Sequence, residues 1–364
     1  MLTSFLQSLP RLGRRWTPLH FTNPNFIRIP MSQAIEEETI PGYIAGRYYP
    51  TRIGEILQGR YQVVGKLGFG ASSTVWLARD MDHRRYVTLK VFIKSTSMGQ
   101  QLDDELKIYK RIEDAPRKHP GRKSSILVWF SLPDFELHHL LINISDIKAD
   151  NIMFGIADDS VFSDFENNEL HNPCPRKELD GRTIYTSRGL RMPKNLGAPV
   201  LCDFGSAVMG DEEHSEDIQP DIYRAPEVIL QAPWSYSVDI WNVGCLIWNL
   251  FEGGSLFSGQ DPEFQSYRSR AHLAEMIRLL GPPSPGFLAR GNLTPKFFSE
   301  EGNLYAGELV GEHIPLEQRE TSLDGEEKEM FLRLVRKMLQ WEPEKRSSAM
   351  ELEQDEWVQA ELHK

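Results

Sequence analysis

A short stretch near the middle of the chain carries a carboxylate, a cation and an amide within six residues. It reads Asp146-Ile147-Lys148-Ala149-Asp150-Asn151. Moving a phosphoryl group needs one group of each kind: a carboxylate that orients a hydroxyl and takes its proton, a cation that offsets phosphate charge, and an oxygen ligand for magnesium. We assign these three roles to Asp146, Lys148 and Asn151 respectively.

A second carboxylate follows an apolar strand pattern farther along the chain. Asp203-Phe204-Gly205 comes directly after Val200–Cys202, whose apolar character is typical of a buried strand. We expect Asp203 to supply the second magnesium contact and to bridge the phosphates of ATP. The predicted cofactors are therefore ATP and Mg²⁺, with Asn151 and Asp203 as the metal ligands.

A glycine-rich stretch, Gly68–Val75, precedes both motifs. Two glycines in such a pattern are a weak signal, because they occur in dinucleotide-binding folds and in ordinary turns. A dinucleotide fingerprint opens a helix, whereas Thr74–Ala78 is β-branched and aromatic, so we expect a hairpin whose backbone amides face phosphates. Ser73 replaces a third glycine and keeps the amide. The expected ATP contacts here are Leu67, Gly68, Phe69, Gly70, Ala71, Ser72, Ser73 and Val75.

A lysine and a glutamate complete the predicted nucleotide site. Lys90 lies between Leu89 and Val91 on an apolar strand, and Glu105 lies on the amphipathic helix that follows. A buried lysine needs a partner charge. Lone lysines and glutamates are usually solvated, but the glycine hairpin before this strand favours Lys90 as a ligand of the α and β phosphates, held by Glu105.

The surrounding elements must position these groups. Strand patterns cover Tyr61–Val64, Thr74–Ala78 and Tyr86–Ile93, and a helix pattern covers Met98–Ile112. The chain then turns polar and irregular from Asn151 to Asn195. Helix patterns return at Ile240–Phe251 and after Asp324. The predicted class is α+β, with a small, mainly β lobe followed by a larger, mainly α lobe.

The order of these motifs resembles the protein kinase signature: glycine hairpin, strand lysine, helix glutamate, D-x-K-x-x-N, D-F-G, then Ala225-Pro226-Glu227. The resemblance implies a bilobal kinase fold and ATP-dependent transfer to serine or threonine. It also implies an ion pair between Glu227 and Arg346. The residues with expected structural roles are Phe204, Gly205, Glu227, Asp239 and Arg346.

Finer details resemble the SR-protein-specific serine/threonine kinases, of the fungal type. The matching stretches are Arg47–Pro50, Ile53-Gly54, Gly59–Tyr61, Ser73–Leu77, Ile147–Met153 and Asp180–Tyr185. This resemblance implies basic, Arg-Ser-rich protein substrates and a part in controlling splicing factors. The acidic residues Asp211, Glu212, Glu213, Glu216 and Asp217 agree with a basic target, although a solvated charge run explains them equally well.

The chain departs from the family pattern at three places. Ile144-Ser145 replaces the His-Arg or His-Thr that usually precedes the catalytic aspartate, and Thr88 takes the place of an alanine that touches adenine. Between Ala115 and Ile144 fewer than 30 residues remain, whereas two strands, a hinge and two helices need roughly 50. Ser124–Phe130 suits one strand and Glu136–Ile142 a helical stub. The alternatives are a catalytically impaired pseudokinase or truncated isoform that acts as a binding protein, and a poorly folding fragment.

Composition sets outer limits. The 364 residues include 41 basic and 52 acidic side chains, a net charge of −11, which argues against direct nucleic-acid binding. Three cysteines without metal-ligand spacing favour a reducing compartment, and the longest apolar stretch, 240–251, is too short to span a membrane. We expect a cytoplasmic and nuclear monomer. The alternative is mitochondrial import through the arginine-rich N-terminus.

These features divide the chain into three parts. Residues 1–45 are expected to be a basic, disordered tail or a presequence. Residues 46–120 should form the small lobe, and residues 121–364 the large lobe, with a long insert at 155–198.

Overall fold

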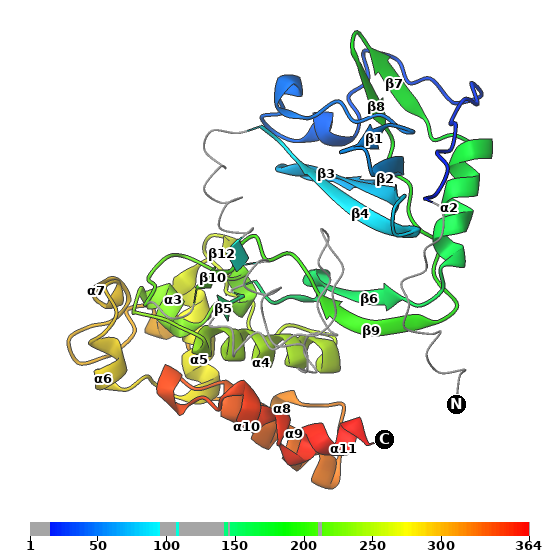
Figure 1. The fold of residues 1–364 in the computed structure, drawn as a ribbon. Coiled ribbons are helices and arrows are strands. Elements are labelled where there is room, and N and C mark those ends of the chain that lie inside the picture. Colours follow the sequence, from blue (N-terminus) through cyan, green and yellow to red (C-terminus); the bar gives the residue numbers. More distant parts are fainter. Residues whose placement is uncertain (1–14, 95–106, 109–141, 145, 210–212, 364) are drawn as a thin grey trace, which may run out of the picture. The chain divides into compact units, whose positions relative to one another are not determined.

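The computed structural model describes residues 15–94, 107–108, 142–144, 146–209 and 213–363, which divide between two units (Figure 1). Among these residues, unit 1 takes 15–94 and Phe154–Ala198, and unit 2 takes the rest. Each unit has its own hydrophobic core and is described by itself.

Unit 1 is built on an antiparallel sheet of strand order β1-β2-β3-β4. The strands are β1 Ile56–Leu57, β2 Tyr61–Phe69, β3 Ser73–Asp80 and β4 Arg85–Phe92. The three strands predicted from the sequence are all present, and β1 is additional. Successive side chains of a strand point to opposite faces of the sheet, so alternate residues of β2, β3 and β4 share one face. On this face they join residues farther along the chain in a core cluster of Tyr61, Val63, Trp76, Ala78, Leu89, Cys174 and Tyr185.

The stretch after the catalytic motif packs against this sheet. It forms helix α2 (Ser160–His171) and a hairpin of β7 (Arg176–Leu179) and β8 (Arg182–Tyr185). Phe165 of α2 packs with Val64 and Leu77. A Cβ at Gly65 would lie 2.7 Å from the Phe165 ring, so only glycine allows this close approach. The sequence predicts an irregular stretch from Asn151 to Asn195 and an insert of the large lobe at 155–198. The structure instead forms α2, β7 and β8 within these ranges, and Phe154–Ala198 belong to unit 1.

Residues 15–45 also pack onto unit 1, where the sequence analysis expected a disordered tail or presequence. The Trp16 amide donates to the Met81 carbonyl at 2.8 Å, and the Ile29 amide donates to the Arg176 carbonyl at 2.9 Å. The Trp16 ring packs on Tyr86 and under the Arg79 guanidinium. Aromatic side chains thus anchor a segment whose arginines alone suggested a tail. It continues into two 3₁₀ turns, η1 (Glu36–Thr39) and η2 (Ala45–Arg47).

Unit 2 is mainly helical, as predicted. The expected apolar helix is α4 (Ser237–Glu252), and the helix after Asp324 is α9 (Gly325–Met338). Ile240 packs with Leu334 and Met338 in its core. The remaining helices and 3₁₀ turns are η5 Ala149–Asn151, η6 Asp221–Tyr223, α3 Pro226–Leu230, α5 Ser269–Leu280, α6 Pro285–Leu288, α7 Thr294–Phe297, η7 Gly307–Leu309, α8 Leu316–Arg319, η8 Pro343–Lys345, α10 Ala349–Glu353 and α11 Glu356–Leu362.

Short strand pairs complete the description. They are β5 (Ile142–Asn143) with β10 (Val208–Met209), β6 (Ile152–Ile156) with β9 (Leu196–Leu201), and β11 (Gln260–Asp261) with β12 (Ser266–Tyr267). The chain leaves unit 2 along β6 and returns along β9. None of the helices in the described ranges has the length and apolarity needed to cross a membrane.

Several predictions fall on residues outside the described ranges. The strand predicted at Ser124–Phe130 lies wholly outside them. Of the predicted helix Met98–Ile112, only Lys107 and Ile108 are described, and both are helical. Of the predicted stub Glu136–Ile142, only Ile142 is described, and it belongs to strand β5 instead.

Candidate active site

The loop from Asp146 to Asn151 brings its three functional side chains together within unit 2. The Lys148 Nζ lies 2.8 Å from the Asp146 Oδ2. The Asn151 Nδ2 donates to the Asp146 backbone carbonyl at 2.8 Å and to its Oδ2 at 3.0 Å. The turn η5 makes this possible, because it folds Asn151 back toward the start of the loop. A carboxylate, a cation and an amide therefore meet at one point, as the sequence spacing predicted.

A buried carboxylate anchors the start of the loop. The Ile144 amide donates to Asp239 Oδ2 at 2.8 Å, and Asp239 lies in the first turn of α4 with only 1% of its surface exposed. Ile144 and Ile147 are buried as well. A charged acceptor makes a strong hydrogen bond to a backbone amide. Asp239 of α4 therefore fixes the position of Ile144, at the start of the loop that carries Asp146.

The Asp203 motif is tied to the same loop. The Cys202 amide donates to the Asn151 carbonyl at 2.8 Å, one residue before Asp203. Asp203 has a φ of 63°, the left-handed region that L side chains other than Asn and Asp rarely adopt. Phe204 is completely buried. Non-glycine residues in this region cluster at functional sites, where the surrounding structure holds them in place.

Asn151 and Asp203 suit a magnesium ion by their chemistry. Mg²⁺ prefers hard oxygen ligands, and these residues offer an amide oxygen and a carboxylate. The two hydrogen bonds from Asn151 Nδ2 to Asp146 turn the amide so that its oxygen points away from Asp146. The donor set therefore fits the predicted metal.

In unit 1, three of the predicted nucleotide residues lie in one row across the sheet. Val75 of β3 is opposite Gly68 of β2 on one side and Lys90 of β4 on the other. Directly opposite residues share a face of the sheet. The Lys90 Nζ also lies 5.0 Å from the centroid of the Phe92 ring on that face. The sheet register thus aligns the glycine hairpin with the strand lysine.

The glycine hairpin itself is short and closed. The Gly70 amide donates to the Ser73 carbonyl at 2.8 Å, and Ala71 and Ser72 form the tip between β2 and β3. Ser73 is buried and paired opposite Phe92. Glu105, the predicted partner of Lys90, lies outside the described residues.

The segment after the Asp203 motif is held by residues that the sequence analysis did not single out. His214 and Trp234 exchange two backbone hydrogen bonds of 3.2 and 2.9 Å, and their rings stack 4.7 Å apart. Gln219, at φ 71°, accepts from the Ala225 amide at 2.8 Å and donates to the Val238 carbonyl at 2.7 Å. These contacts join distant parts of unit 2, so no local pattern could reveal them.

The predicted ion pair between Glu227 and Arg346 is present. The Arg346 guanidinium donates to both carboxylate oxygens of Glu227 at 2.5 and 2.7 Å, and both side chains are fully buried. Arg346 also donates to the Ser237 carbonyl at 2.8 Å, directly at the start of α4. The pair therefore ties α3 to the helix that anchors the loop carrying Asp146.

Comparisons with known proteins point the same way. Residues 192–358 match the model of the protein kinase domain. A serine/threonine protein kinase of Aspergillus fumigatus is 37% identical over 403 aligned positions, covering 99% of this chain and 98% of that protein. Serine/threonine-protein kinase SRPK of Physarum polycephalum is 25% identical, with 86% and 89% covered. Dual specificity protein kinase CLK2 of Homo sapiens is 28% identical, with 81% and 63% covered.

The alignment with the Aspergillus protein also bears on chain length. Its 403 positions exceed the 364 residues of this chain by 39, so the relative carries at least 39 residues that have no counterpart here. The comparison gives this total without its position along the chain, and the sequence predicts a shortfall of about 20 residues before Ile144.

The fold agrees with the sequence comparisons. A crystal structure of a kinase domain matches with a TM-score of 0.62 at 20% identity, covering 85% of this chain and 98% of that one. The chain has the protein kinase fold and belongs to the serine/threonine protein kinases.

Proposed function

We propose that this kinase transfers the γ-phosphoryl group of ATP to a serine or threonine hydroxyl of a basic, Arg-Ser-rich protein. The observation that carries the chemistry is the meeting of Asp146, Lys148 and Asn151 at hydrogen-bond distance. Asp146 orients the hydroxyl and accepts its proton as the new oxygen–phosphorus bond forms and ADP leaves. Lys148 offsets the charge on the γ-phosphate. Bound Mg²⁺ would neutralise the phosphate oxygens, and Asn151 and Asp203 are the residues that would hold it.

The substrate class rests on charge. Within the described part of the segment before Arg224, four carboxylates are exposed: Glu213, Glu216, Asp217 and Asp221. Hydrogen bonds from backbone amides, its own and that of Ser215, hold the pKa of Glu216 below its usual range, so it is ionised at neutral pH. An ionised, exposed acidic surface favours basic substrates. The similarity to the Physarum kinase SRPK supports the same class.

A competition between peptides tests the substrate proposal. An Arg-Ser peptide should be phosphorylated in preference to neutral or acidic serine peptides, and the preference should fade as salt screens the charges. Neutralising the surface with Glu213→Gln and Glu216→Gln should raise the KM for the Arg-Ser peptide several-fold. The matched control is Glu300→Gln with Glu301→Gln, two exposed carboxylates elsewhere in unit 2. A preference for acidic peptides would contradict the Arg-Ser substrate class and leave the assignment as a serine/threonine kinase unchanged.

A binding protein that keeps the fold without turnover is the second candidate. The shortfall of at least 39 residues relative to the Aspergillus kinase favours it. A thermal melt with Mg-ATP separates the two candidates, because a ligand that binds only the folded state raises its melting temperature. Stabilisation together with peptide phosphorylation supports the enzyme. A cooperative melt without a shift, and no turnover, supports the binding protein.

A further inference from the structure

Residues Ile35–Tyr48, here called the N-terminal brace, contact the glycine hairpin at its root and at its tip. The brace contains the turns η1 and η2 and packs within unit 1. Most of it lies in residues 1–45, which are expected from the sequence to be a tail, and it contains none of the residues of the proposed mechanism.

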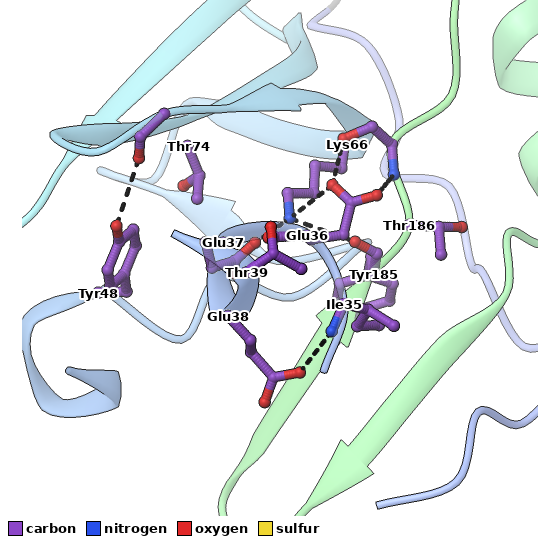
Figure 2. A network of polar contacts seen from close by, with 12 residues as sticks. Ile35, Glu36, Glu37, Glu38, Thr39, Tyr48, Lys66, Thr74, Tyr185 and Thr186 are labelled. Carbon is purple, nitrogen blue, oxygen red and sulfur yellow. Dashed lines mark hydrogen bonds and ion pairs between the residues drawn. The ribbon is translucent and has the colours of Figure 1, made fainter. Parts of the chain in front are cut away.

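At the root, the brace holds a buried lysine. Lys66 lies on β2, directly before the glycine hairpin, and is only 1% exposed. Its Nζ donates to the Glu37 carboxylate and lies 3.3 Å from Glu36 Oε2 (Figure 2). Its charge also lies 5.2 Å from the Phe69 ring, which belongs to the hairpin. A charge so deeply buried depends on its partners, so breaking the pair would be costly. The brace thereby fixes the root of the hairpin.

The brace is itself fastened to the β7–β8 hairpin and the residues after it. Glu38 accepts from Lys177 Nζ at 2.9 Å through both of its oxygens. Glu36 accepts from the Ser187 amide at 2.9 Å and from the Ser187 hydroxyl at 2.6 Å. Arg182 donates to the Tyr48 carbonyl. The brace is therefore held by Lys66 of β2 and by the β7–β8 hairpin with Ser187.

At the tip, one tyrosine contacts the hairpin backbone. The buried Tyr48 places its hydroxyl 3.3 Å from the carbonyl oxygens of both Gly70 and Ala71. One phenol proton is shared between these two acceptors. In a trans peptide the carbonyl and the amide N–H point in opposite directions. Drawing the two carbonyls toward Tyr48 therefore turns the amides of Ala71 and Ser72 away from it.

We propose that Tyr48 is a positioning residue for ATP, orienting the two tip peptides so that their amides can donate to the phosphates. The inference rests on the proposed ATP-dependent function and adds a residue to it from outside the glycine motif. Tyr48 touches no reacting atom and acts through the backbone of Gly70 and Ala71.

The test is Tyr48→Phe, which removes the hydroxyl and keeps the buried ring. We expect the KM for ATP to rise about 3- to 10-fold, the effect of losing one shared hydrogen bond, while the KM for the peptide is unchanged. The binding of Mg-ATP should weaken while the binding of adenosine, which has no phosphates, should not. A general loss of structure would weaken both. The matched control is Tyr49→Phe. The Tyr49 side chain is exposed, and its hydroxyl donates to Glu55 at 2.9 Å, away from the hairpin tip.

Two outcomes contradict the inference in distinguishable ways. Wild-type protein that binds no Mg-ATP would overturn the proposed function and this inference with it. Wild-type protein that binds Mg-ATP, together with a Tyr48→Phe variant that matches it in ATP affinity and in KM for ATP, would overturn the inference alone.

Discussion

The side-chain amide of Asn151 holds Asp146 at two points, its backbone carbonyl at 2.8 Å and its carboxylate at 3.0 Å. The same side chain presents its oxygen toward the opposite direction, where it suits a magnesium ion. One residue therefore sets both the direction of the carboxylate that we propose accepts the proton and the position of a proposed metal ligand. Through the Asn151 carbonyl, which accepts from the Cys202 amide, this control extends to Asp203.

Replacing the strand lysine should impair nucleotide binding and turnover together. Lys90→Met removes a cation from the sheet face that also carries Val75 and Gly68, and charge-assisted contacts to phosphate are stronger than neutral ones. We expect steady-state kinetics to show a KM for ATP raised about tenfold or more and a lower kcat. The control is Lys94→Met, an exposed lysine just past β4. Undiminished activity of Lys90→Met would remove Lys90 from the site.

The ion pair of Glu227 and Arg346 should matter for stability. Arg346→Ala leaves a buried carboxylate without its partner, which costs about 3 to 5 kcal/mol of unfolding free energy. Arg290→Ala breaks the pair with Glu344, which is about half exposed on both sides, and should cost under about 1 kcal/mol. Urea unfolding measures both. Equal losses of unfolding free energy in the two variants would contradict the prediction that the buried pair stabilises the fold more than the exposed pair.

His272 should make stability depend on pH. It is buried on α5 beside Phe257, with a ring nitrogen 3.1 Å from the Tyr267 hydroxyl. Burial, aided by the nearby charge of Arg224, lowers the pKa of His272 to about 3. The unfolded chain therefore binds one more proton below about pH 6.5, and stability falls from that pH toward pH 3.

His272→Gln should remove that dependence. Between pH 7 and pH 5, the wild-type protein should lose about 2 kcal/mol more unfolding free energy than the variant. Urea titrations of both proteins at the two pH values measure the difference. The same pH dependence in both proteins would show that His272 is not the responsible group.

Activity should not need phosphate on the segment from Ser206 to Arg224. The residue before Asp146 is a serine, which cannot make the bidentate contact of an arginine. Arg224 already contacts Asp217 at 3.4 Å and Asp221 at 3.0 Å. Phosphatase treatment should therefore leave the rate within about twofold, under ~0.5 kcal/mol in barrier. A large loss that an upstream kinase restores would show that another basic residue binds such a phosphate.

The catalytic loop could be predicted from the sequence because its groups lie within six residues and a single turn brings them together. The hairpin and Lys90 could be predicted because strand alternation and a simple register relate them. The Asp180-Gly181 pair, with Gly181 at φ 75°, was a hairpin signal for β7 and β8 that the polar surroundings obscured.

The N-terminal brace could not be predicted in the same way. Lys66 and Glu37 lie 29 residues apart, and an isolated lysine beside apolar residues most often belongs to a solvated surface. The tertiary packing of residues 15–45 and of β8 against the sheet buries these charges, and the Lys66 Nζ also donates to the Tyr185 carbonyl at 3.3 Å. The contacts of Gln219 and Trp234 depend on tertiary packing for the same reason.

The most direct test of the central claim, that Asp146 accepts the hydroxyl proton during phosphoryl transfer, is the activity of Asp146→Asn. The amide keeps the shape of the side chain and loses the base. Phosphorylation of an Arg-Ser peptide should fall by roughly two or more orders of magnitude, while Mg-ATP affinity stays nearly unchanged. Turnover equal to that of the wild-type protein would remove Asp146 from the mechanism and contradict the account.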